Sequence, residues 1–254
     1  MQRVIKQIVF YVLFIVIWEM SVRAGGWGPD IMPKPTDVWE ALIQGFIDKT
    51  LIYDLGASFQ RLLIGLTIAL ILGTSLGILL AKSQTADDTL GSLILALQSV
   101  PSIVWLPLAI MWFGLNEKAV IFIVVLGGTL VMTINMRIGI KNVSPLYIKA
   151  AQTMGSSGFD LFIKIIFPAS IPYAVTGARL AWAFAWRALM AGEILSTGPG
   201  LGYTLKYASD FGNMSLVIAV MILIGVIGTI VDLLFFQRVE KNVMRRWGLE
   251  QASS

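Results

Sequence analysis

The sequence predicts an all-α polytopic membrane protein, and three observations support this fold class. Of its 254 residues, 57% are hydrophobic and only 13% are charged, whereas about a quarter of the residues in a typical soluble domain are charged. The mean hydropathy is +0.80. Several apolar stretches reach the length of about 20 residues that a helix needs to cross a hydrocarbon core of roughly 30 Å. A water-soluble globular protein is therefore not expected.

Six stretches have the length and composition of transmembrane helices. In chain order they are residues 4–22, 62–81, 93–113, 119–136, 166–195 and 216–236.

Prolines and glycines are expected to shape three of these spans. The third contains Pro101 and Pro107, and the fifth begins with Pro168 and Pro172, so these helices are expected to be broken or kinked. Such breaks either turn backbone carbonyls toward a cavity or are static kinks, and both interpretations stay open. In the second span, the pattern Gly73-x-x-x-Gly77 permits close approach of a neighbouring helix.

The first span has a second interpretation as a secretory signal. Arg3 and Lys6 precede its apolar stretch, and Val22-Arg23-Ala24 weakly resembles a cleavage site. The stretch is long for a signal, and Arg immediately before the cut is unfavourable, which favours a retained helix.

The distribution of basic residues predicts the orientation. Eleven Lys and Arg lie in segments on the same side as the N-terminus, against six on the other side. Because cytoplasmic segments carry the excess of Lys and Arg, both termini are expected in the cytoplasm. The net charge of +4 reflects this bias and needs no nucleic acid to explain it.

The outer loop, residues 23–61, is expected to carry an amphipathic helix. It opens with the turn-forming run Gly25-Gly26-Trp27-Gly28-Pro29. Thr36 can then cap a helix. One face of that helix is expected to hold the apolar residues Val38, Leu42, Ile43 and Phe46.

The inner loop, residues 137–164, is expected to contain two short helical segments. Ser144-Pro145 is a helix-start signal, Gly155-Ser156-Ser157-Gly158 interrupts the chain, and a second helical stretch begins over residues 159–167. We call these two segments and the turn between them the inner knob. Pattern alone leaves open whether this knob is a solvated connector or a docking element.

The residue inventory excludes several kinds of chemistry. The chain has no Cys, which excludes disulfides and thiolate catalysis, and no His, the commonest general base. It also lacks the phosphate-binding pattern GxxxxGK[ST]. The Gly198–Gly202 run lacks dinucleotide-binding spacing and is interpreted as a tight turn. The functions that this inventory still allows are transport, sensing or assembly in a membrane.

Charges in the fifth span are the main candidates for function. Arg179, Arg187 and Glu193 lie within it or at its end, where a charge costs several kcal/mol unless it is paired or hydrated. Trp182 and Trp186 share a helical face with Arg179. Arg179 either lines a hydrated path that favours anions or holds helices together through a carboxylate. The partners considered for such a pair are Glu19, Glu193 and Asp232.

The inner loop resembles a motif of a known transporter family. Lys149-Ala150-Ala151-Gln152-Thr153-Met154-Gly155, nine further residues and Ile165-Ile166-Phe167-Pro168 match the spacing of the EAA motif of binding-protein-dependent ABC importer permeases. That motif reads E-A-A, three residues, G, nine residues, I-x-L-P. Lys149 replaces its Glu and Phe167 its Leu, so a role for a carboxylate at position 149 is not expected.

Further segments resemble the nitrate/sulfonate/taurine/bicarbonate group of this family, and together with the motif they cover nearly the whole chain. They are Met32-Pro33-Lys34-Pro35, Pro101-Ser102-Ile103-Val104-Trp105-Leu106-Pro107-Leu108-Ala109, Trp112-Phe113-Gly114, Gly177-x-Arg179, Gly200-Leu201-Gly202-Tyr203, and the tail residues Asp232, Glu240, Arg245 and Trp247.

The resemblance implies a MetI-like permease that forms a single transmembrane domain over residues 1–254, in the bacterial-type cytoplasmic (inner) membrane. It implies a homodimer that works with two cytoplasmic ATP-binding cassette subunits and an extracytoplasmic solute-binding protein, surrounded by membrane lipid. No cofactor is expected on this chain, because ATP and Mg²⁺ are used by the partner ATPase. The knob would then dock on that ATPase through Lys149, Ala150, Ala151, Met154, Gly155, Ser156, Gly158 and Pro168.

The resulting functional hypothesis is an ATP-driven importer of a small anion or related nutrient, such as a sulfonate, taurine or nitrate. Its expected pathway residues are Pro101, Trp105, Arg179, Trp182, Trp186 and Glu193. A secondary carrier driven by an ion gradient is the alternative, with Glu193 and Asp232 as its titratable candidates, but it leaves the knob without a role. A membrane-embedded enzyme lacks His, Cys and paired acids at workable spacing.

Overall fold

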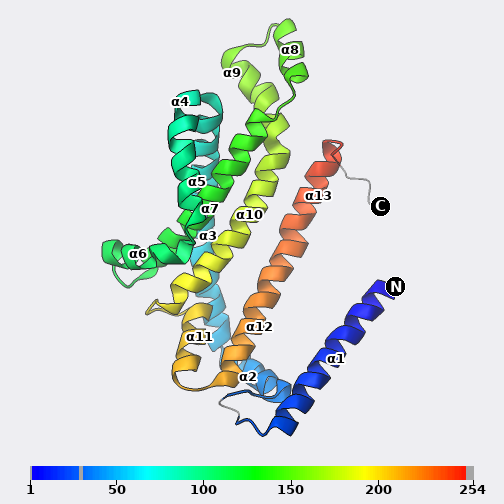
Figure 1. Cartoon of the computed structure of the whole chain (residues 1–254), viewed down its shortest axis with the longest axis vertical. Coiled ribbons are helices and arrows are strands. Elements are labelled where there is room, and N and C mark those ends of the chain that lie inside the picture. The colour runs from blue at the N-terminus through cyan, green and yellow to red at the C-terminus, as the bar shows by residue number, and fades with distance from the viewer. Residues whose placement is uncertain (1, 29–30, 250–254) are drawn as a thin grey trace. The chain divides into compact units, whose positions relative to one another are not determined.

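The computed structural model describes residues 2–28 and 31–249, and within these residues the regular elements are helices joined by loops, with no strand (Figure 1). Pro29, expected in the outer-loop turn, and the residues beyond Leu249 lie outside the described part. The α-helices are α1 Gln2–Gly25, α2 Pro35–Ile47, α3 Thr50–Lys82, α4 Gln84–Ala86, α5 Ser92–Ser99, α6 Leu106–Phe113, α7 Glu117–Lys141, α8 Pro145–Thr153, α9 Gly158–Leu161, α10 Phe167–Ile194, α11 Leu201–Asp210, α12 Met214–Val231 and α13 Gln237–Arg246. Four short segments join them, the 3₁₀ turn η2 Ser102–Trp105 and the π-helical turns η1 Asp87–Gly91, η3 Phe162–Ile166 and η4 Asp232–Phe236.

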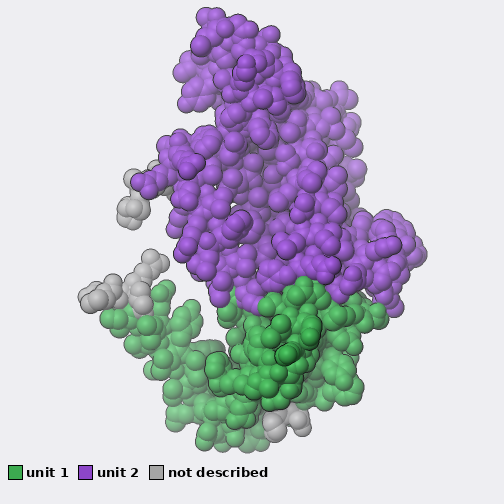
Figure 2. Space-filling view, turned by 180° about the vertical axis from the view of Figure 1, so that it is seen from behind, with its two compact units in different colours: residues 1–58, 193–226 green, residues 59–192, 227–254 purple. Residues whose placement is uncertain are grey.

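Contacts divide the chain into two compact units, which Figure 2 colours separately. One comprises residues 1–58 and 193–226, and the other residues 59–192 and 227–254. The single domain expected over residues 1–254 stays a prediction.

Five helical segments are long and apolar enough to cross a membrane, and a bent pair makes up to six. The five are Ile5–Gly25, Thr50–Lys82, Glu117–Lys141, Gly158–Ile194 and Met214–Arg246. The bent pair, Gln84–Ser99 and Ser102–Phe113, corresponds to the expected third span and turns by 97°. Val100 is extended there because a following proline, Pro101, disfavours helical backbone at the residue before it. Pro107 lies in the first turn of α6, where a missing N–H does no harm.

The second span begins earlier than expected. Helix α3 starts at Thr50 instead of Leu62, so residues placed in the outer loop are helical. Asp54, Ser58 and Arg61, whose polarity suggested a loop, are buried in the structure. A polar side chain that finds a buried partner does not interrupt a helix, and local polarity could not reveal those partners.

The outer-loop helix forms, with a different start. Helix α2 begins at Pro35 with Lys34 before it, so the expectation that Thr36 caps the helix was wrong. Proline at the first helical position has no N–H to satisfy, and the Asp37 carboxylate accepts the Lys34 backbone N–H at 3.3 Å. Of the expected apolar face, Val38 is buried, whereas Ile43 and Phe46 are exposed within this chain.

Small residues bring α3 and α7 together in the larger unit, as the Gly73-x-x-x-Gly77 pattern predicts. A Cβ placed on Gly73 would lie 2.5 Å from the Met132 Cβ. One placed on Gly77 would lie 2.6 Å from the Met136 Cβ and 2.8 Å from the Thr133 carbonyl oxygen. These distances are far below van der Waals contact, so the helix pair requires glycine at both positions.

We therefore expect Gly77→Ala to lower the melting temperature of the detergent-solubilised protein. Overpacking of this kind costs about 1–3 kcal/mol, which outweighs the gain in helix propensity of about 1 kcal/mol. Gly56→Ala is the matched control on the same helix, because its added methyl group meets nothing within 4 Å. Equal melting temperatures for the two variants would contradict the packing argument.

Candidate functional site

The inner knob, which comprises residues 144–161 in the structure, is built from local signals that the structure confirms. The Ser144 hydroxyl accepts the Leu146 N–H at 3.3 Å, and Pro145 opens α8. After α8 the chain turns at Gly155, with φ of +88°, and enters α9 at Gly158, with φ of +54°. Both values are in the left-handed region that side chains with a Cβ rarely adopt. The tight reversal between α8 and α9, visible in Figure 1, thus depends on these two glycines.

Apolar side chains project from the knob instead of packing inside it. Met154 is 87% exposed, Phe159 75% and Leu146 70%. The expected coupling residues Lys149, Ala150, Gly155 and Gly158 are also exposed, whereas Ser156 is half-buried and Ala151 is buried. The Ser156 hydroxyl donates to the Asp160 carboxylate at 2.9 Å, and Lys164 pairs with the same carboxylate at 2.6 Å. The knob is therefore internally braced and carries an unpartnered apolar surface within the described chain.

A cavity of about 640 Å³ lies beside the knob. It brings together four expected coupling residues, Ala150, Ala151, Met154 and Pro168. Trp247 also lines it and donates its indole N–H to the Pro168 carbonyl at 3.2 Å. Trp247 is part of the tail that resembles the family, but no local pattern in the sequence predicts that it lies next to the knob. Only the tertiary fold brings the C-terminal segment to the start of α10.

Arg179 is held by two carboxylates of the C-terminal helix. Its Nε and Nη2 atoms donate to Asp232 at 2.8 and 2.7 Å, and Nη1 donates to Glu240 at 2.7 Å. Thr176 donates to the same Glu240 at 2.7 Å. Of the interpretations left open, the structure thus shows the ion pair with Asp232. Glu240 was not considered as a partner, because it lies two helical turns beyond Asp232 and reaches Arg179 only when the helix continues past residue 236.

Trp182 and Trp186 form an aromatic stack in the larger unit. Their ring centroids are 5.7 Å apart, and Trp182 also stacks on Phe236 at 5.3 Å. Both tryptophans are buried, and a Cβ on Gly228 would lie 2.8 Å from the Trp186 indole nitrogen. They share the helical face of Arg179, as expected, and pack α10 against the C-terminal helix.

Pro101 and Trp105 lie at the bend between α5 and α6 and line a cavity of about 50 Å³ together with Gly127 and Phe184. The Trp105 indole N–H is buried and has no hydrogen-bond partner within the described part of the chain. A cavity of this size admits at least one water molecule. An available donor beside a small cavity is the feature that marks this bend as a candidate contact for a polar solute.

Glu193, the last expected pathway residue, belongs to the smaller unit, whereas the other five belong to the larger one. Its fully buried carboxylate accepts the Ser58 hydroxyl at 2.8 Å and the Gly202 N–H at 3.0 Å. Nearby, Asp54 accepts the Gly200 N–H at 3.1 Å. A Cβ on Gly200 would lie 2.6 Å from the Glu193 carboxyl carbon. The expected tight turn at 198–202 is therefore tied to α3 by buried carboxylates and leads into helix α11, which the sequence analysis did not predict.

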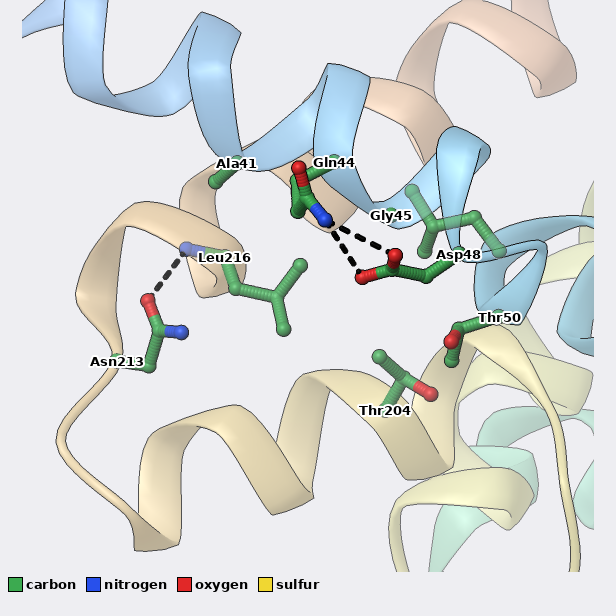
Figure 3. Close-up of a pocket in the computed structure, with 9 residues that line it drawn as sticks. Ala41, Gln44, Gly45, Asp48, Thr50, Thr204, Asn213 and Leu216 are labelled. Carbon is green, nitrogen blue, oxygen red and sulfur yellow. Dashed lines mark hydrogen bonds between the residues drawn. The ribbon is translucent and has the colours of Figure 1, made fainter.

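A cavity of about 240 Å³ in the smaller unit is shown in Figure 3. It lies between α2, the start of α3, α11 and the start of α12. Gln44 donates to the Asp48 carboxylate at 2.9 and 3.0 Å, and Asn213 accepts the Leu216 N–H at 3.1 Å. Gln44 and Asp48 thus bond to each other across one turn at the end of α2, and Asn213 caps the start of α12.

Comparison with known proteins identifies the family. The sequence profile of the binding-protein-dependent transport system inner membrane component matches residues 65–243. The chain belongs to this family. It is a permease subunit of an ABC importer and a multi-pass protein of the inner membrane, as predicted. Membership favours this function over the secondary carrier.

Relatives and a solved structure agree with this assignment. A protein of Methanocaldococcus jannaschii named as an ABC transporter permease is 37% identical, covering 87% of this chain and 84% of its own length. A nitrate import permease of Leptolyngbya laminosa is 30% identical, with 89% and 83% covered, and the taurine transport permease of Escherichia coli is 29% identical, with 87% and 82% covered. The inward-facing MetNI methionine ABC transporter shares the fold, with a TM-score of 0.68 at 16% identity over 78% of this chain and 97% of that chain. The expected MetI-like fold is thereby confirmed.

We expect Arg179→Ala to lower the permease's melting temperature, because it leaves Asp232 and Glu240 facing each other without a cation. Loss of one partner from a fully buried pair costs about 3–5 kcal/mol, and partial exposure reduces this to about 1–3 kcal/mol here. Arg187→Ala is the control on the same helix, since Arg187 is exposed and lies 5.7 Å above the Phe184 ring. A destabilisation by Arg187→Ala equal to that by Arg179→Ala would contradict this account.

Proposed function

We propose that this permease forms the membrane path of an ATP-driven importer as a homodimer. Two separate ATP-binding cassette subunits would hydrolyse ATP on the cytoplasmic side, where both termini of the permease lie. An extracytoplasmic solute-binding protein would deliver the solute from outside. The permease itself binds no cofactor in this scheme, because ATP and Mg²⁺ stay with the ATPase.

The observation that carries this proposal is the exposed apolar surface of the inner knob. Met154, Phe159 and Leu146 project from a segment that is braced internally and begins with a capped helix. Leu146 and Met154 lie outside the segments that are long and apolar enough to cross a membrane, and apolar side chains exposed at such a surface indicate a protein contact. Ala150 and Gly155 let a partner approach closely, since neither carries a bulky side chain. An ATPase groove that accepts α8 accounts for this surface.

The proposed mechanism depends on a rigid connection between each knob and the helices on either side of it. Closure of the ATPase pair on ATP would displace the two knobs, and each knob is covalently joined to α7 on one side and α10 on the other. The displaced helices would then open the path toward the outside, the solute would enter, and hydrolysis would reset the permease. The proposed contacts with the ATPase are Lys149, Ala150, Ala151, Met154, Gly155, Ser156, Gly158 and Pro168.

The solute is proposed to be a small anion, such as nitrate, taurine or another sulfonate. Relatives named as nitrate and taurine permeases support this class. The free indole N–H of Trp105 suits an oxyanion, because it is a donor without a competing acceptor. Arg179 would contribute only if one of its carboxylates is released during the cycle. The proposed pathway residues remain Pro101, Trp105, Arg179, Trp182, Trp186 and Glu193.

Reconstitution tests this function directly. Vesicles holding the permease, its ATPase and its binding protein are expected to accumulate the anion only with ATP and all three components. Accumulation by the permease alone, driven by an ion gradient, would instead support a secondary carrier.

For the knob, we expect Gly155→Trp to abolish transport-linked ATP hydrolysis while membrane insertion is retained. A tryptophan at φ of +88° strains the turn and blocks the docking surface. Gly212→Trp is the control, because Gly212 also has a positive φ, of +71°, and open space around it, but lies outside the knob. ATPase binding and ATP-coupled uptake are measured for both variants. Normal coupled turnover in Gly155→Trp would refute the proposed role of the knob.

A further inference from the structure

A buried ion cluster lies at the base of the inner knob. The Asp87 side chain is only 5% exposed and accepts hydrogen bonds from two cations of α7. Arg137 binds it with two nitrogens, one of them at 2.7 Å, and the Lys141 ammonium contacts the same carboxylate. Gly91 leaves room for this arrangement, since a Cβ there would lie 3.0 Å from an Asp87 carboxylate oxygen. A carboxylate that binds two cations in a largely buried site holds its helices firmly, because removing it strands both charges.

The segment that leads into Asp87 also contacts the chain on the other side of the knob. Lys82, at the end of α3, lies with its ammonium 3.5 Å from the centroid of the Phe162 ring. Phe162 is the first residue of η3, directly after α9, and it packs with Met136 and Ile140 of α7 in one apolar cluster. Residues 82–87 therefore contact α7 immediately before the knob and η3 immediately after it.

Asp87 also lies in the first turn of the helix Gln84–Ser99, which leads to the candidate solute contact. It is the first residue of η1, which continues into α5 and reaches the 97° bend at Pro101. Trp105, with its free indole N–H, lies at this bend. A π-helical turn inside a longer helix is often found at functional sites. A displacement of the knob would thus reach Trp105 through η1 and α5, provided that Asp87 keeps its hold on α7.

We propose that Asp87 is a positioning residue that transmits movement of the inner knob to the bent segment α5–α6. The inference rests on the proposed coupling function of the knob. We call the cluster of Asp87, Arg137 and Lys141 the clamp. Arg137 and Lys141 are the part of the clamp that moves with α7. Asp87 acts through these two cations and does not itself contact the solute or the ATPase.

The test uses Asp87→Asn in the full complex reconstituted with its ATPase and solute-binding protein. The amide preserves the shape of the side chain and removes its charge. We expect the ATPase to bind normally and to hydrolyse ATP, while the amount of solute imported per ATP falls by about fivefold or more, the range typical of coupling between two sites. A residue with a purely structural role would reduce the amount of complex and leave this ratio unchanged.

Asp88→Asn is the matched control. Asp88 is the next residue, is exposed, and accepts a hydrogen bond from Gln84 of the same turn at 2.9 Å. We expect its import per ATP to equal that of the unaltered complex. An Asp87→Asn complex with the same ratio as Asp88→Asn overturns the proposal.

A charge swap provides the rescue. In the double variant Asp87→Arg with Arg137→Asp, the new carboxylate is four residues from Lys141 on α7 and can bind both cations. Recovery of a substantial part of the lost import per ATP supports the clamp, and no recovery beyond the Asp87→Asn value counts against it. If Asp87→Asn does not accumulate, Lys141→Gln removes one of the two partners, and an intermediate loss of coupling is then expected, whereas an unchanged ratio overturns the proposal.

The outcome separates this inference from the proposed function on which it rests. If Gly155→Trp abolishes coupled hydrolysis but Asp87→Asn leaves import per ATP unchanged, the knob keeps its role and only the clamp is wrong. If Gly155→Trp turns over normally, the coupling function itself fails.

Discussion

Compensation of charge inside apolar helices is the constraint on which the structure depends. A charged side chain within a membrane span costs several kcal/mol unless it is paired or hydrated. Arg179 meets this requirement through Asp232 and Glu240, Asp87 through Arg137 and Lys141, and Arg61 through Glu117 at 2.8 Å. Each group joins helices that are far apart in the sequence. Pairing therefore lets the chain keep its charges and at the same time specifies which helices are neighbours.

The inner knob differs from the ion pairs, because apolar side chains are exposed on its surface. Ser144 accepts a backbone N–H at the start of α8 and Ser156 donates to Asp160 within the knob, whereas Met154 and Phe159 have large apolar areas exposed. An internally braced segment with exposed apolar surface is suited to docking, because binding costs little conformational entropy and removes apolar area from water. The ion cluster at Asp87 lies where this segment meets the helices. In the proposed mechanism, the docked knob and the bent segment α5–α6 therefore move together.

The parts that sequence patterns predicted well were those with local causes. Apolar length indicated where spans lie, Ser144-Pro145 indicated the start of α8, and Gly155 indicated the reversal after it. The spacing from Ala150 to Pro168 indicated the family before any comparison. The predicted helix start and ion-pair partners were wrong or incomplete where a contact with a residue far away in the sequence determines the structure. Helix α3 extends back to Thr50 because its polar residues are buried among partners, and Arg179 binds Glu240 because the last helix continues past Phe236.

The sequence by itself thus determined the membrane class, the apolar spans, the turn glycines and the EAA-like spacing, because each depends on residues that are near one another in the chain. Tertiary structure decided which carboxylates hold Arg179, that Trp182 stacks on Phe236, and that Asp87 contacts both Arg137 and Lys141. These contacts join residues about 50 positions apart. Their formation depends on how whole helices pack, and the periodicity of a single helix carries no information about its neighbour.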